Sequence, residues 1–127
     1  MSVAQLNQST FSNEILYVNT AVNNSVSSIK GSPGRMFYAQ IDNSNNLNSV
    51  WLKLYDLAAG SVVVSVTDPN EIILVPGNSV VTAVFSSFAG TPGKLYANAI
   101  SAICVTTPGT TGNAAPLNNV GLQIKYS

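Results

Sequence analysis

The chain has 127 residues, of which 46% are hydrophobic and only 8% are charged, and its five basic and five acidic side chains sum to zero. Soluble globular domains usually carry roughly 25% charged residues, and nucleic-acid binding needs clustered Lys or Arg to displace counterions from phosphates. Because the charges are scattered singly, the composition argues against a nucleic-acid partner. Near-zero net charge instead favours association with other protein surfaces.

Histidine is absent, and Cys104 is the single cysteine. These counts exclude an intrachain disulfide and any catalytic arrangement that needs a histidine base. Cys104 lies in the apolar run AISAICV, which favours a small buried side chain over a reactive thiol. The N-terminus has no basic stretch followed by an apolar one, and no window approaches 18 apolar residues, so we expect neither a secretory signal nor a membrane span.

Residues 1–13 are polar, lack periodicity and contain no Gly or Pro. We interpret them as an N-terminal arm that is ordered only when something holds it, with an unattached tail as the alternative. Residues 14–127 are then predicted to form a single β domain. Between residues 14 and 30 an imperfect alternation predicts one or two short strands that break near Asn23 and Asn24. The candidate inward positions are Ile15, Tyr17, Val22, Val26 and Ile29.

Two hydrophobic runs, residues 36–41 and 50–55, flank the Asn- and Ser-rich tract 42–49. This pattern predicts two antiparallel strands joined by a polar loop, and we interpret the hairpin as the nucleus of the domain. In its second strand one parity is aliphatic and should enter the core. The residues of that parity are Val50, Leu52 and Leu54.

The other parity of the same strand carries Trp51, Lys53 and Tyr55, and Tyr38 and Met36 would lie opposite them in a suitable register. Exposed aromatic side chains mark interaction surfaces, so such a row could contact another subunit or stack on a sugar ring. The alternative is that Trp51 packs under a neighbouring loop or in a second part of the core.

Further short apolar runs follow, separated by turn residues about ten positions apart. They predict strands in VVVSV, EIILV and SVVTAV, one long strand in KLYANAISAICVTT, and a last strand in VGLQIKY, where alternate residues are apolar. Residues 107–119 are rich in Gly and Pro and are predicted to form a long loop. About eight strands without an amphipathic helix indicate an all-β fold with the rhythm of an antiparallel sandwich or barrel.

No catalytic pattern emerges from the remaining polar residues. The five acids do not pair along the sequence, a Ser-Lys arrangement has no supporting motif, and a phosphate-binding GxxxxGK[ST] loop is absent. We therefore expect a protein that is not an enzyme and has no cofactor. A calcium site built from Asp and Asn oxygens in residues 42–48 is the alternative for that tract, although it lacks further carboxylates.

The segments IKGSPGRMFYAQIDNSNN, VWLKLYD, IILVPGNS and APLNNVGLQIKYS, in this order, resemble small β-sandwich proteins of the virions of tailed bacteriophages, including cyanophages. Some of these are capsid decoration, or cement, proteins. The similarity covers residues 22–127. It implies a jelly-roll-like or Greek-key sandwich on the outer surface of the capsid, often as a homotrimer, that bridges neighbouring capsomers. The first loop is unusually rich in Asn, and the loop at 107–119 has no match.

We therefore predict a decoration protein that is made in the host cytoplasm and then binds the assembled head of the virion, with the major capsid protein and further copies of itself as partners. Neither a nucleic acid nor a membrane is expected as a partner. The alternative is a head-fibre or tail-appendage module that binds carbohydrate or a host surface through its aromatic side chains. The candidate contact residues are Leu6, Phe11, Asn43, Asn45, Asn46, Trp51, Tyr55, Thr110 and Asn113.

Overall fold

The computed structural model describes residues 14–85 and 93–127, which form nine β-strands and one short 3-10 helix. No helix in these ranges is long and apolar enough to cross a membrane. The elements are β1 (Ile15–Val22), β2 (Ser27–Lys30), β3 (Gly34–Asp42), β4 (Val50–Tyr55), η1 (Ala59–Ser61), β5 (Glu71–Val75), β6 (Val80–Val84), β7 (Lys94–Tyr96), β8 (Ile100–Val105) and β9 (Val120–Tyr126).

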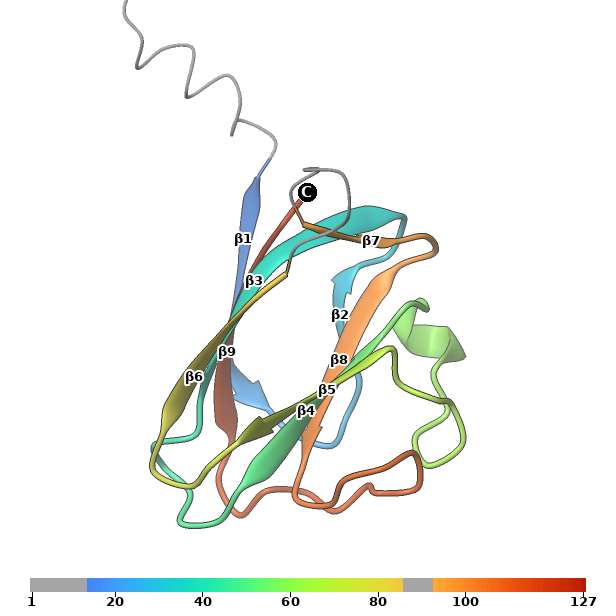
Figure 1. Ribbon diagram of the computed structural model, residues 1–127. Helices are drawn as coiled ribbons and strands as arrows, with labels where there is room; N and C mark the ends of the chain where they lie inside the picture. Colours follow the sequence, from blue (N-terminus) through green and yellow to red (C-terminus); the bar gives the residue numbers. More distant parts are fainter. Residues whose placement is uncertain (1–13, 86–92) are drawn as a thin grey trace, which may run out of the picture.

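The strands form two antiparallel sheets that pack face to face (Figure 1). Sheet one has the order β1-β9-β3-β6, and sheet two has the order β2-β8-β4-β5. The short β7 pairs with residues 34–36 of β3, and β6 pairs with residues 38–42 on the same side of that strand. Apart from the short β7, which stays in sheet one after β6, the chain changes sheet at every connection except that between β4 and β5, and the topology is that of a jelly roll. The predicted all-β antiparallel sandwich is confirmed.

The predicted central hairpin is wrong. β3 lies in sheet one between β9 and β6, whereas β4 lies in sheet two between β8 and β5. Residues 43–49 therefore form an arch between the sheets rather than a hairpin turn. Two apolar runs around a polar loop are typical of both arrangements, and only the partners that each strand finds elsewhere distinguish them.

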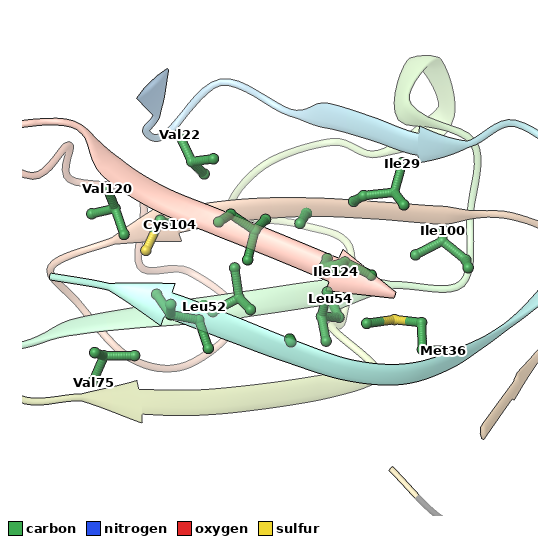
Figure 2. Close-up of a cluster of buried hydrophobic side chains, with 14 of the residues drawn as sticks. Val22, Ile29, Met36, Leu52, Leu54, Val75, Ile100, Cys104, Val120 and Ile124 are labelled. Atoms are coloured by element: carbon green, nitrogen blue, oxygen red, sulfur yellow. The ribbon is translucent and has the colours of Figure 1, made fainter. Parts of the chain in front are cut away.

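The core fills the space between the sheets with aliphatic side chains from most of the strands (Figure 2). Val50, Leu52 and Leu54 are fully buried there, as their parity predicted. The predicted alternation of β9 is also confirmed, since its inward residues are buried or packed on the core. Each fully buried aliphatic side chain contributes about 1.5–3 kcal/mol relative to an exposed one.

The first strands also follow the prediction in part. The chain breaks after β1, at residues 23–26, and resumes as β2. Val22 and Ile29 are buried, and Tyr17 and Val26 pack against buried clusters. Ile15, however, is half exposed, because it lies at the open end of the sandwich where β1 begins.

Two of the other predicted strands are wrong. The run from residue 94 to 107 is two strands, because β7 belongs to sheet one and β8 to sheet two. The carboxylate of Asp56 accepts hydrogen bonds from the backbone amides of Ala97, Asn98 and Ala99, and it stabilises the bend between them. The run VVVSV is not a strand either, since it lies in turns that follow η1.

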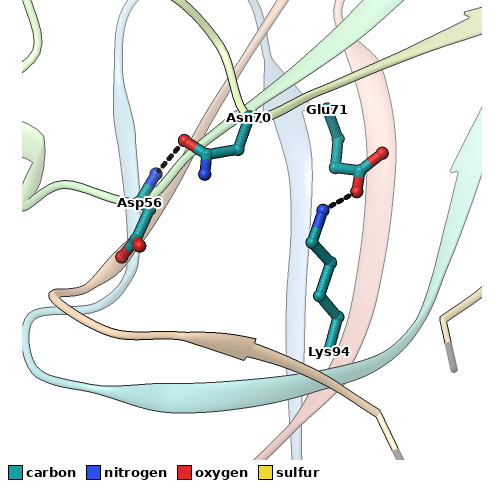
Figure 3. Close-up of polar contacts among 4 residues, drawn as sticks. All are labelled: Asp56, Asn70, Glu71 and Lys94. Atoms are coloured by element: carbon teal, nitrogen blue, oxygen red, sulfur yellow. Dashed lines mark hydrogen bonds and ion pairs between the residues drawn. The ribbon is translucent and has the colours of Figure 1, made fainter. Parts of the chain in front are cut away.

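Polar contacts close the sandwich near the beginning of β5 (Figure 3). The backbone amide of Asp56 donates to the side-chain oxygen of Asn70 at 3.1 Å. One position further on, Glu71 of sheet two forms an ion pair with Lys94 of sheet one. These contacts join the end of β4, the start of β5 and the short β7.

Candidate functional site

The face of β4 that carries Trp51, Lys53 and Tyr55 is the outer face of sheet two, and it is largely covered. Lys53 and Tyr55 are fully buried, and Trp51 is half-buried. Tyr38 and Met36 do not lie opposite them, because they belong to sheet one. The predicted row of aromatic side chains therefore does not form a single exposed platform.

A small second core lies on this outer face. Tyr55 packs there with Ile103 and Val105 of β8. Val62 and Val64 pack on the same group from the segment between β4 and β5, as does Val26. Two valines of the run VVVSV, Val62 and Val64, thus help to cover sheet two, whereas Val63 and Val66 are exposed. Packing under a neighbouring loop was predicted as the alternative for Trp51, but it is Tyr55 that packs in this second core, and Trp51 is half-buried.

Lys53 holds the second covering segment, the loop at residues 107–119. Its Nζ donates to the backbone carbonyl of Gly112 at 2.7 Å and also to that of Gly109. Among the described residues Lys53 has no carboxylate partner. Burial lowers the pKa of Lys53, because the charged form loses hydration. Gly109 has a φ of 80°, a conformation that a glycine adopts without a steric penalty.

Two more contacts fix this loop at its sides. The hydroxyl of Thr110 donates to the carboxylate of Asp68 at 2.6 Å, which joins the two covering segments. The side-chain amide of Asn24 donates to the carbonyl of Asn113 at 3.1 Å. Thr110 is half-buried and Asn113 is exposed, so of these two predicted contact residues Asn113 is the more accessible to a partner.

The Asn-rich arch between β3 and β4 is organised around a buried amide. Asn43 is fully buried, and its side-chain nitrogen lies within 3.0–3.2 Å of the carbonyl oxygens of Asn48, Val75 and Pro76. One side chain thus joins the arch to the β5–β6 turn. A buried polar group of this kind is costly unless it is hydrogen-bonded, and here it is well supplied with partners.

Asn46 extends this network to the covering loop. Its nitrogen donates to the side-chain oxygen of Asn43 and to the carbonyl of Asn118, both at 2.9 Å. Its oxygen accepts the backbone amide of Asn118 at 2.8 Å. Asn43 and Asn46 were predicted as contact residues, but both side chains are buried within the chain and belong to its internal structure.

Some of the oxygens considered for a calcium site take part in these contacts, since the side-chain oxygens of Asn43 and Asn46 both accept hydrogen bonds. Asp42 accepts hydrogen bonds from the hydroxyl and the backbone amide of Ser44, and these bonds lower the pKa of Asp42. Across the described ranges no group of three or more acidic, Cys or His side chains is placed to hold a metal ion. Cys104 is buried as predicted, and burial raises its pKa to about 12.

The arch, the β5–β6 turn and the covering loop together form the loop end of the sandwich, defined here as residues 43–49, 76–79 and 107–119 (Figure 1). Two leucines protrude from it, since Leu47 is 84% exposed and Leu117 is 93% exposed. Both line a hollow of about 220 Å³ whose other walls are mainly amide side chains, including the exposed Asn45. Large exposed aliphatic side chains on a well-bonded surface are candidates for contact with a partner.

Sequence reasoning missed these leucines because it followed the polar residues of the loops. The signal was present, since Leu47 is the one large aliphatic residue in a tract of Asn and Ser, and Leu117 is the one in a tract of Asn, Ala and Pro. The backbone of Leu47 packs closely against the backbone of Gly77 in the β5–β6 turn. A Cβ atom on Gly77 would lie only 2.0 Å from the carbonyl oxygen of Leu47. Leu6 and Phe11, which were predicted as contacts of the arm, lie outside the described residues.

Comparisons of the chain with protein-family models, with curated proteins and with solved structures gave no match. No relative therefore indicates a ligand or a partner for the loop end or for either outer face of the sandwich.

Proposed function

We propose that this protein is a structural component of a tailed-phage virion, a decoration protein that binds the outer surface of the assembled capsid and bridges neighbouring capsomers. The resemblance of residues 22–127 supports this proposal. A jelly roll is also a fold that virion proteins use, although the same fold serves many functions. The partners would be the major capsid protein and further copies of this chain.

The observation that carries the proposal is the pair of leucines at the loop end. Leu47 and Leu117 are almost fully exposed, and the amide network of Asn43 and Asn46 holds their loops in place. Burying both side chains against a partner would contribute about 3–6 kcal/mol per copy before the costs of association. Because such a contact forms only on the assembled lattice, many copies would stabilise that state by mass action.

Particles that lack this protein provide the test. We expect them to release DNA at a lower temperature than complete particles, and purified wild-type protein should restore the higher temperature when it is added back. The double variant Leu47→Ser, Leu117→Ser should bind the particles weakly and fail to restore it. Val66→Ser, which removes an exposed side chain from the other covering segment, is the matched control and should behave as wild type.

Equal heat stability of particles with and without the protein would refute the proposed function. If the double variant restored the release temperature fully, the contact with the capsid would have to lie elsewhere than at the loop end. The copy number per virion gives a second measure, since hundreds of copies fit a lattice protein and a handful fit a fibre or a tail component.

A further inference from the structure

The outer face of sheet one has an unusual distribution of side chains. Its middle strands, β9 and β3, carry mainly polar groups there, among them Gln40, Gln123 and Lys125, and Lys125 forms an ion pair with Glu14 at 3.9 Å. The aliphatic side chains lie instead on the two outer strands, β1 and β6. Burying the middle of this face against a partner would desolvate amides and a charge, whereas burying its edges would not.

The exposed aliphatic side chains of the two outer strands are large. On β1, Leu16 is 50% exposed and Val18 is 55% exposed. On β6, Val80 is 51% exposed and Val84 is 79% exposed. The apolar surface of sheet one is therefore divided between its opposite edges, where contact with a second sheet edge would cover it.

Within residues 14–85 and 93–127, the edge strands β1 and β6 have little of the usual protection, which is confined to a register irregularity between Asn19 and Val22 of β1. An edge strand presents unpaired backbone groups, and proteins commonly guard it with charges, proline or short length. Neither β1 nor β6 contains a charged residue or a proline, and in the described part of the chain each pairs on one side only. In sheet two, by contrast, β2 has four residues and ends in Lys30, and β5 begins with Glu71.

The two edges also match each other in direction. β1 is antiparallel to β9, β9 to β3, and β3 to β6, so β1 and β6 run in opposite directions. A second copy rotated about an axis along the strands would thus place its β6 beside β1 as an antiparallel partner. This pairing is the type in which the backbone bonds are perpendicular to the strands.

Length and side-chain position match as well. β1 keeps a regular register with β9 over five residues, up to Asn19, and β6 has five residues. Val18 and Thr82 lie at opposite ends of one row across the sheet, through Gln123 and Gln40. When copies are related by that rotation, Val18 of one copy meets Thr82 of the next. Leu16 meets Val84 in the same way, and β-branched and aliphatic pairs of this kind stabilise strand pairing.

We propose that copies of this chain associate edge to edge, with β1 of one copy pairing with β6 of the next to form a continuous sheet. A head-to-tail contact of this kind covers both edges when it closes into a ring. Pairing of β1 with itself across a two-fold axis would leave β6 uncovered. The inference rests on the two edges alone and does not depend on the proposed function.

Disulfide trapping tests this contact directly. In a Cys104→Ala background, the double variant Val18→Cys, Thr82→Cys should form covalent oligomers on mild oxidation, because the Cα atoms of facing residues in antiparallel strands lie within the separation that a disulfide spans. Val18→Cys alone and Thr82→Cys alone should stay monomeric on a non-reducing gel. The matched control is Ser28→Cys with Ile72→Cys, on the two edges of sheet two, and it should form no ladder.

Charge exchange supplies a second, independent measurement. Val18→Lys should raise the dissociation constant of self-association by about tenfold or more, as measured by sedimentation equilibrium. Adding Thr82→Glu to the same chain should recover most of that loss, since the introduced lysine of one copy would then face the introduced glutamate of the next. An unchanged urea midpoint would show that both variants fold.

Three results would overturn the proposal. The first is a wild-type protein that remains monomeric at every concentration tested. The second is efficient cross-linking of the single variant Val18→Cys, which would indicate a two-fold contact of β1 with itself. The third is an associated protein whose double-cysteine variant forms no disulfide between copies.

Discussion

The middle strands of the two sheets differ in what covers their outer faces. β9 in sheet one presents Gln123 to solvent, whereas β8 in sheet two presents Ile103 and Val105 to a second layer of chain. The covering layer consists of residues 56–70 and 107–119, which Lys53 and other polar contacts hold in place. The middle strand β9 of sheet one is therefore buried on one face, and the middle strand β8 of sheet two on both.

This difference explains the two kinds of strand sequence in the chain. β9 alternates apolar and polar residues, as a strand does when one face is solvated. β8 reads ISAICV, and every residue in it is buried. Double-sided burial of a strand thus arises here in an antiparallel sheet, because loops rather than helices cover its outer face.

The largest difference is expected when one side chain is truncated on the outer face of each sheet and the losses in free energy of unfolding are compared. Ile103→Ala should lower the free energy of unfolding by about 2–5 kcal/mol, because it removes a fully buried side chain from the small second core. Gln123→Ala, at an exposed outward position of β9, should stay within about 0.5 kcal/mol of wild type. Urea denaturation followed by fluorescence measures both values.

Similar losses for the two variants would contradict the difference between the faces. A small loss for Ile103→Ala, below about 1 kcal/mol, would mean that the covering segments do not bury this side chain in solution.

A smaller effect is expected when the attachment of the covering loop is removed. Lys53→Met should lower the free energy of unfolding by about 1–3 kcal/mol, because the carbonyls of Gly109 and Gly112 lose a charged donor. The loop should also open more often. Hydrogen exchange at the amide of Thr106, which donates to the carbonyl of Ala114, should then become faster.

Lys125→Met is the control, since Lys125 lies on the solvated face and forms only a long ion pair with Glu14. Its effect should be below about 1 kcal/mol. If Lys53→Met left the exchange of Thr106 unchanged, Lys53 would not be the residue that holds the loop.

The smallest effect is the change of stability with pH that is due to Cys104, which is buried between the sheets. Cys104 has its pKa raised by burial from 9.0 to about 12, so the stability from its neutral thiol is complete below pH 9 and is lost as the pH rises toward 12. Between pH 8 and pH 10 this loss is about 1.4 kcal/mol. The pKa of Lys53 is lowered by burial from its ordinary value of 10.5. Its contribution to stability therefore changes in the opposite direction and rises with pH up to that value.

Comparison of wild type with Cys104→Ala separates the thiol from the other groups. The variant should lose less stability than wild type between pH 8 and pH 10, as measured by urea titrations at each pH. Parallel pH profiles would show that Cys104 is not buried away from solvent in the folded protein.

The amino-acid pattern predicted most of the strands and several of their inward faces. Alternation is a local property, so Val50, Leu52 and Leu54 on β4 and the apolar parity of β9 could be assigned from the sequence. The turns before β5 and β6 were also correct, because Pro fixes φ locally and Gly allows backbone conformations that other residues avoid. The loop at 107–119 was recognised from its composition for the same reason.

The candidate site was much less predictable. Asn45, Trp51 and Asn113 keep at least part of their surface, but Asn43, Asn46 and Tyr55 are buried within the chain. A polar side chain in a loop serves equally well as a surface group or as an internal hydrogen-bonding partner. Which of the two it becomes depends on the carbonyl groups that distant segments bring to it.

By itself the sequence determined an all-β chain of short strands with little charge, since strand periodicity and turn chemistry act over a few residues. Tertiary structure decided that β3 and β4 separate into different sheets, that the run from residue 94 to 107 divides, and that the VVVSV segment becomes a cover instead of a strand. It also decided that other segments of the chain cover the outer face of β8, whereas that of β9 meets solvent. These outcomes depend on pairing and burial between residues far apart in the chain, which no local pattern specifies.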